Sequence, residues 1–401
     1  MKQALVSIFT TRAIFTAMLT LFCLGFTAAS SLPYMSIIAT EQLEMTANSY
    51  SLIILAAAVC GLAGSLALGH FSDTARDRKP LLLFVLLVGA SGFGIFAIWP
   101  SIITFLLLQL VVMPVSGASY GQLMAAIRSA TAGKPEAASI NSIVRAVFAL
   151  SWVVAPGIVG AFMATRTEVS DSIIISSLAF CFCLTVCFAF MQSVPQTAQV
   201  ASGWSGLKDA ANAVRSLPLM LRVAALSCIG AVVPANMALM PLLVVNMPGA
   251  SLADVGLVAG VVALLEVPFM LLGAYLVQRW PLQRIIVAGG VIHAAYLAGL
   301  AFATNLPHIY GLAVINAAGA AISLSIHISY LQGLLPERPG LGTSLYSVNV
   351  LANRSIAAGV FALAGLNWGL QGAAIAGAAI ALAGCCAILL LDGTAIKRVA
   401  V

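Results

Sequence analysis

The sequence predicts an all-α membrane protein with twelve transmembrane helices in two pseudo-symmetric six-helix bundles. Three observations predict this fold class. Of the 401 residues, 62% are hydrophobic and 7% are charged, whereas about a quarter of the residues of a soluble domain carry charge. Apolar runs recur along the whole chain with brief polar breaks, and basic residues collect in alternate breaks. Such a chain cannot build a water-soluble surface.

Twelve apolar runs reach the length of about 20 residues that a helix needs to cross the ~30 Å hydrocarbon layer. The first run is too long for the apolar core of a signal peptide, so it is expected to remain as a span. The longest polar stretch, 196–216, is expected to be a cytoplasmic linker between a bundle at 1–195 and a bundle at 217–401. The expected spans are 13–39, 48–70, 80–99, 101–127, 139–164, 171–192, 217–246, 251–278, 283–303, 307–333, 341–366 and 369–391.

The basic residues test this count, because Lys and Arg favour the cytoplasmic side of a membrane. Arg166 falls on the opposite side, and Arg145 and Arg354 fall within spans. The even count with both termini in the cytoplasm puts the other fifteen of the 18 on one side: Lys2, Arg12, Arg76, Arg78, Lys79, Arg128, Lys134, Lys208, Arg215, Arg222, Arg279, Arg284, Arg338, Lys397 and Arg398. The net charge of +6 therefore reflects topology, and nucleic acid is not expected as a partner.

Cysteine usage and motif content argue against catalysis and bound cofactors. All eight cysteines lie inside apolar runs, which favours packing over disulfides. The chain has no H-E-x-x-H motif and no evident nucleophile–base pair. We therefore expect no metal, no cofactor and no enzymatic activity, and a chain that acts as a monomer.

Three ionisable residues inside spans are candidates for function, because charge within the bilayer is costly. Glu266 has five apolar or small residues on either side, so it is a candidate for proton coupling or for an ion pair with a buried arginine. Arg145 is a candidate for binding substrate hydroxyl groups or for neutralising Glu266. Arg354 holds a similar place in the second bundle, and with Asn349 and Asn353 it forms a polar helix face that we expect to line a cavity.

Other polar or conformationally special residues extend the candidate binding site. His327 lies in a polar stretch of the tenth span and is a candidate either for titration near neutral pH or for a neutral hydrogen-bonded role. Pro33 in the first span and Asn236, two residues after Pro234 in the seventh, lie where unwound turns would offer backbone groups to a solute. Tyr34 and Trp152 are candidate aromatic partners for a sugar ring.

The stretch GHFSDTARDRKPLL (69–82) resembles the loop between spans 2 and 3 of the major facilitator superfamily. Gly69, Asp73, Arg78 and Leu81 match the family spacing, whereas the residues at 74, 76 and 77 depart from it. The resemblance implies a latch in which Asp73 meets the start of span 11, near 340–344, in one conformation and releases it in the other. Gly69 would permit close helix approach, and Arg78 would also help to fix topology.

Two further elements resemble the bacterial sugar efflux transporter family. One is carried by Ser142, Arg145, Trp152 and Pro156, and the other by Leu265, Glu266, Pro268 and Tyr275.

This resemblance implies export of small sugars or glycosides across the bacterial inner membrane, in exchange for protons. Pro156 and Gly160 also match half of an element found in major facilitator antiporters. A multidrug exporter of the same fold and a transport-inactive sensor are the alternatives, although the short C-terminal tail leaves no room for a signalling extension.

Overall fold

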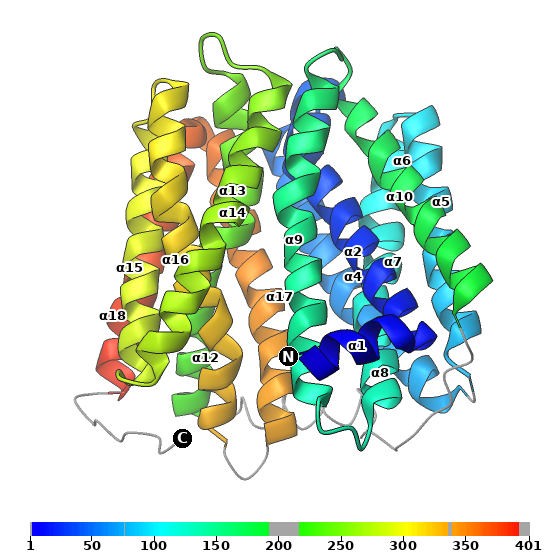
Figure 1. Cartoon of the computed structure of the whole chain (residues 1–401). Helices are drawn as coiled ribbons and strands as arrows, with labels where there is room; N and C mark the ends of the chain where they lie inside the picture. The colour runs from blue at the N-terminus through cyan, green and yellow to red at the C-terminus, as the bar shows by residue number, and fades with distance from the viewer. Residues whose placement is uncertain (1, 76, 192–215, 336–338, 393–401) are drawn as a thin grey trace. The chain divides into compact units, whose positions relative to one another are not determined.

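The computed structural model describes residues 2–75, 77–191, 216–335 and 339–392, and the long elements of that part of the chain are helices (Figure 1). In the first half they are α1 (Lys2–Thr10), α2 (Arg12–Ser31), η1 (Leu32–Tyr34), α3 (Met35–Ile37), η2 (Ile38–Gln42), α4 (Ala47–Thr74), α5 (Lys79–Ile98), α6 (Ile102–Leu107), η3 (Leu108–Val112), α7 (Met113–Gly117), α8 (Ser119–Thr131), α9 (Ala137–Met163), η4 (Val169–Asp171) and α10 (Ser172–Phe190). In the second half they are α12 (Leu217–Gly230), α13 (Val232–Val245), α14 (Leu252–Val277), α15 (Leu282–Ala301), α16 (Leu306–Gly333), α17 (Pro339–Leu363), η5 (Ala364–Trp368) and α18 (Gly369–Asp392).

Eleven stretches of the described chain are long and apolar enough to cross a membrane, and the last of them contains two helices. This stretch, Leu345–Asp392, has 48 residues. As one α-helix it would be roughly 72 Å long, against a hydrocarbon layer of about 30 Å. The chain turns within it, because Leu366 and Asn367 leave the helical conformation and Gly369 has a φ of +64°. α17 and α18 are therefore separate spans, and the expected twelve-span fold is confirmed.

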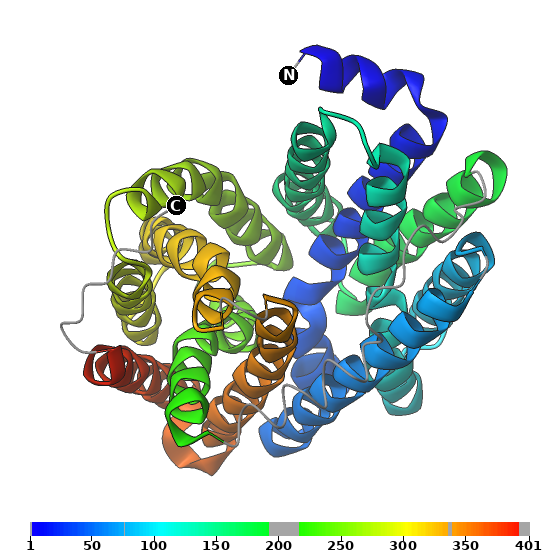
Figure 2. The ribbon, with the colours of Figure 1, turned by 90° about the horizontal axis from the view of Figure 1, so that it is seen from below.

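The short helix α1 was not expected from the sequence. It precedes the first span and is separated from α2 by Thr11, which has an extended backbone. Figures 1 and 2 show that α1 runs crosswise to the neighbouring helices, at the outer edge of the first unit. Nine residues are too few to cross a bilayer, so α1 is an additional element at the end of the first span.

Proline interrupts the first and seventh spans at the positions marked by the sequence. After α2, the chain passes through the 3-10 turn η1, which contains buried Pro33, and then through α3 and the π-helix η2. In the seventh span, α12 ends at Gly230 and α13 begins at Val232. Pro234 has no N–H to donate to the carbonyl group of Gly230, which explains this break. A bilayer tolerates such breaks where protein surrounds them.

Contacts divide the chain into two compact units, one comprising Met1–Leu43 and Val59–Ser202 and the other Glu44–Ala58 and Gly203–Val401. The helix α4 contributes residues to both. In the first unit α2 packs against α9 and α10, and α10 packs against α5. In the second unit α12 packs against α18, and α15 packs against α16 and α18. The contacts of spans 1 and 3 with span 6 thus recur as contacts of spans 7 and 9 with span 12.

Two positive side chains bind the C-terminal end of α10, the last helix of the first unit. Arg12, at the start of α2, donates from Nη2 to the backbone oxygen of Ala189 at 3.3 Å. Lys79, at the start of α5, donates from Nζ to the backbone oxygens of Met191 at 2.6 Å and Phe188 at 3.3 Å. Cations stabilise the carbonyl end of a helix, so these contacts join the starts of spans 1 and 3 to the end of span 6.

The second unit repeats this arrangement with a stronger set of contacts. Arg222, near the start of α12, donates to Asp392 Oδ1 at 2.7 Å and to the backbone oxygen of Leu391 at 2.8 Å. The hydroxyl group of Tyr330, near the end of α16, donates to Asp392 Oδ2 at 2.8 Å. In both units, an arginine of the first span therefore binds the end of the sixth.

A glycine permits the close packing of α12 and α18. A Cβ atom built on Gly384 would lie 2.6 Å from the backbone oxygen of Ala225 and 2.8 Å from Cys228 Cβ. Both neighbours are attached directly to the backbone of α12, so neither can move aside alone. Small residues let membrane helices approach in this way.

We expect Gly384→Ala to lower the melting temperature of the purified protein, because overpacking typically costs about 1–3 kcal/mol. Gly359→Ala in α17 is the matched control, since a Cβ there would meet no described atom within 4 Å. That control should leave stability unchanged or raise it, because alanine is about 1 kcal/mol better than glycine within a helix. Thermal unfolding in one detergent compares the two, and equal stability of both variants would contradict the packing argument.

Candidate functional site

The three charged groups predicted inside spans lie on α9, α14 and α17. The side chains of Arg145 and Arg354 are exposed, and that of Glu266 is half-buried. Within the described residues, none of the three forms a hydrogen bond or an ion pair, and Glu266 and Arg354 of the second unit are not paired with each other. Because an isolated charge facing hydrocarbon is costly, these helix faces require water or a polar ligand.

The local structure around Glu266 adds a second polar group. Pro268 lies inside α14, and its missing N–H leaves the carbonyl group of Leu264 without the usual helical partner. The neighbouring side chains are aliphatic, and Leu264 and Val267 are both exposed. A carboxyl group and a free carbonyl group therefore occur within one turn of an otherwise apolar helix.

A buried polar network joins spans 7, 9 and 10 inside the second unit. The hydroxyl group of Tyr296 donates to Asn236 Oδ1. One turn away on α15, His293 Nε2 lies 3.0 Å from Asn316 Oδ1 of α16. These four residues and His327 are each less than 5% exposed. The Oδ1 atom of Asn236 thus already accepts a hydrogen bond. The amide N–H groups of Asn236 can donate to another partner.

The predicted polar face of α17 divides into two parts. Asn349 donates from Nδ2 to Ser227 Oγ at 2.8 Å. Asn353, with its amide nitrogen turned toward α12, donates to the backbone oxygens of Asn349 at 2.8 Å and Ser227 at 3.2 Å. Both asparagines are buried against α12, whereas Arg354 is exposed. Asn353 packs so closely on Gly230 that a Cβ there would lie 2.6 Å from the nearest atom of its amide group.

The aromatic candidates of the first unit differ in their burial. Pro33 and Tyr34 lie in η1, where both are buried, and Tyr34 has no exposed surface. Trp152 lies on α9 and is half-buried, two turns beyond Arg145. Trp152 and Arg145 therefore have more exposed surface than Tyr34.

The latch residues are only partly covered by the structure. Arg78 is buried, with 7% of its surface exposed, and the backbone N–H of Lys79 donates to Asp77 Oδ1 at 3.0 Å. No described atom lies within 4 Å of a Cβ built on Gly69. The side chains of Asp73 and of residues 340–344 lie outside the described part, and the latch stays a prediction.

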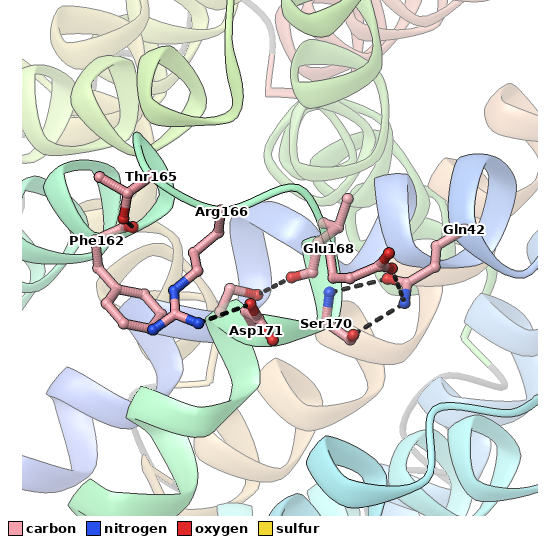
Figure 3. A network of polar contacts seen from close by, with 9 residues as sticks. Gln42, Phe162, Thr165, Arg166, Glu168, Ser170 and Asp171 are labelled. Atoms are coloured by element: carbon pink, nitrogen blue, oxygen red, sulfur yellow. Dashed lines mark hydrogen bonds and ion pairs between the residues drawn. The ribbon is translucent and has the colours of Figure 1, made fainter.

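A further polar network lies at the other end of the first unit (Figure 3). Gln42, at the end of η2, donates to Ser170 Oγ at 2.9 Å and to Glu168 Oε2 at 3.2 Å, and it accepts from the Ser170 backbone N–H at 2.8 Å. Beside it, Arg166 Nη1 lies 3.5 Å from Asp171 Oδ2. These contacts hold the end of the first span against the connection between spans 5 and 6.

Sequence reasoning missed Tyr296, Asn316 and Gln42. A usable signal existed for α15, because His293 and Tyr296 are three residues apart and so share a helix face. No such signal marked Gln42, whose partners are more than 120 residues away in the chain.

Paired six-helix bundles with charged groups on the faces of their spans define a class of protein, the secondary transporters. The family model "Major Facilitator Superfamily" matches residues 17–358, and the chain belongs to this superfamily of membrane transporters, which are not enzymes.

Three relatives with similar sequences have names that refer to sugar efflux. A Deinococcus radiodurans protein whose name refers to sugar efflux is 30% identical over 336 residues, covering 82% of this chain and 85% of the relative. Sugar efflux transporter B of Salmonella typhimurium is 26% identical over 351 residues, covering 86% and 87%. Sugar efflux transporter A of Escherichia coli is 26% identical over 345 residues, covering 86% of each chain. The resemblance inferred from the motifs is confirmed.

Solved structures agree on the fold. A variant of the nucleoside transporter NupG aligns with a TM-score of 0.82 at 12% identity, covering 94% of this chain and 99% of that one. The POT family transporter PepTSo aligns with a TM-score of 0.76 at 10% identity, covering 95% and 97%. At such low identity these matches establish the fold and nothing of the substrate.

We expect Tyr296→Phe to lower the melting temperature, because it leaves buried Asn236 Oδ1 without its donor, a loss of about 1–3 kcal/mol. Tyr275→Phe on α14 is the matched control, since that side chain is 47% exposed and its hydroxyl group bonds to none of the described residues. Thermal unfolding gives the melting temperatures of both variants. A Tyr296→Phe variant as stable as Tyr275→Phe would show that the hydrogen bond contributes little.

Proposed function

We propose that this transporter exports small sugars or glycosides by alternating access, in exchange for protons. It would do so in the bacterial inner membrane with both termini in the cytoplasm. The observation that carries the proposal is the similarity to sugar efflux transporters, which extends over more than four-fifths of the chain in each of the relatives above. The distribution of Lys and Arg supports the orientation.

Arg145 and Arg354 are the proposed substrate-binding groups. Each guanidinium group has five N–H donors, and neither is bound by a carboxylate in the described structure. Sugar hydroxyl groups would accept from these donors. Trp152 would offer a ring face, and Tyr34 and Pro33, which are buried in this structure, would contribute a ring face and backbone groups in a conformation that uncovers η1. Asn236, Asn353 and His327 would add polar contacts.

Glu266 is the proposed proton-coupling group. A carboxylate among aliphatic side chains is unfavourable unless it is paired or hydrated, and Glu266 has no such partner among the described residues. Protonation removes the charge, so the empty transporter could complete its return with Glu266 neutral. Release of that proton on the cytoplasmic side would then link each export event to a proton moving inward.

We expect Glu266→Gln to abolish sugar uptake driven by an imposed pH gradient in inverted vesicles, while counterflow of labelled against unlabelled sugar persists. The amide retains the size of the carboxyl group but cannot exchange a proton. Glu136→Gln, located before α9 and outside the spans, should leave both activities intact. Coupled uptake by Glu266→Gln at the wild-type rate would exclude Glu266 from this role.

A multidrug exporter of the same fold is the second candidate. It is favoured by the aliphatic surroundings of Glu266, where Leu264, Val267 and Met270 are all exposed. Proteoliposomes with an imposed pH gradient, supplied with a panel of labelled sugars and cationic drugs, separate the two. Movement of drugs without sugars would overturn the first proposal.

A further inference from the structure

The helix α1 presents apolar side chains away from the protein. Ala4 and Ile8 are fully buried against the first unit, whereas Leu5, Val6 and Phe9 are exposed. The helix runs crosswise to the spans at the outer edge of the unit (Figures 1 and 2). A short helix with one apolar outer face in this position is typical of a segment that lies in the membrane interface.

Two positive groups lie beside this helix, at the end of α10. Arg12 is the first residue of α2, and its exposed guanidinium group lies 5.5 Å from the ring centre of Phe190. Lys79 reaches the same last turn of α10 through its ammonium group. Within the described residues neither side chain forms an ion pair with a carboxylate, and the nearby carboxylate of Asp77 accepts from the Lys79 backbone instead.

Capping of α10 accounts for only part of this arrangement. Arg12 uses one of its five N–H donors and Lys79 uses two of its three on backbone oxygens. Cations are favourable at a helix end, but that role gives no reason for the aromatic surface around them. Phe9 and Phe15 pack together with ring centres 5.7 Å apart, and both are exposed, as are Phe188 and Phe190.

Cations at the level of the headgroups with apolar rings beside them match the two parts of a phospholipid. Phosphate oxygens accept charge-assisted hydrogen bonds from Arg and Lys, and basic sites at the ends of membrane helices bind anionic headgroups. We propose that the elbow between α1 and α2, together with the end of α10, binds an anionic phospholipid. Arg12 and Lys79 hold the phosphate, and Phe9, Phe15, Phe188 and Phe190 contact the acyl chains.

The test compares the full-length protein in nanodiscs of phosphatidylcholine alone and with added phosphatidylglycerol. Phosphatidylglycerol should raise the melting temperature of the wild type by several degrees, and the Arg12→Gln, Lys79→Gln double variant should lose most of that rise. The result for each protein is the difference between its melting temperatures in the two lipid compositions. A lower stability of the double variant, caused by loss of its contacts with the end of α10, therefore does not affect the comparison.

Arg166→Gln is the matched control. Its guanidinium group also lies over a phenylalanine ring, 4.6 Å from the centre of Phe162, but it follows an odd number of spans and so lies at the other end of the unit. This variant should keep the full rise. An equal rise in the double variant, or none in the wild type, overturns the proposal. A rise produced equally by inorganic phosphate also overturns it, because the ligand would then be a free anion.

Hydrogen–deuterium exchange of the wild-type protein is a second test, which needs no variant. Phosphatidylglycerol should slow exchange in residues 2–12 relative to phosphatidylcholine, with no change around 164–171. Unchanged exchange in α1 would contradict the proposal even if the double variant could not be purified.

Discussion

A backbone N–H or C=O group that enters hydrocarbon must find its partner within the protein, and this constraint underlies the whole structure. It explains why twelve long apolar runs are all helical. It also explains why the breaks at Pro33 and between Gly230 and Val232 occur where side chains bury the chain. Charged residues are restricted by the same cost, so most lie at the ends of spans. The few inside spans need water, a partner or a ligand.

The fold could be predicted closely because span length is set by bilayer thickness, a quantity external to the sequence. No predicted span boundary differs from the observed helix by more than four residues, as at the end of the fourth span, expected at 127 and observed at Thr131. The helix α1 was missed because it is too short to register as a span. The turn at η5 was expected only as a gap between two runs, since a positive φ at Asn367 leaves little trace in composition.

The sequence could indicate which polar residues are candidates for the site, but not which residues they contact. Charge or amide groups inside apolar runs mark Arg145, Glu266, Asn236 and Asn353 on cost alone. Their neighbours depend on how each helix is rotated about its own axis. These spans are apolar on nearly every side, so hydrophobic periodicity does not specify that rotation. The contact of Tyr296 with Asn236, and the packing of Asn353 on Gly230, could therefore be found only from the structure.

The arginine contacts at the bundle ends also bear on biosynthesis. Arg12 binds the end of the sixth span, and Arg222 binds the end of the twelfth. Since chains emerge from the N-terminus and domains fold as units during synthesis, the span that carries each arginine is made well before its partner exists. A six-helix unit can thus be closed only when its final helix has been inserted. A chain stopped after the fifth or the eleventh span would leave an open bundle whose first helix still lacks the helix end that it is built to hold.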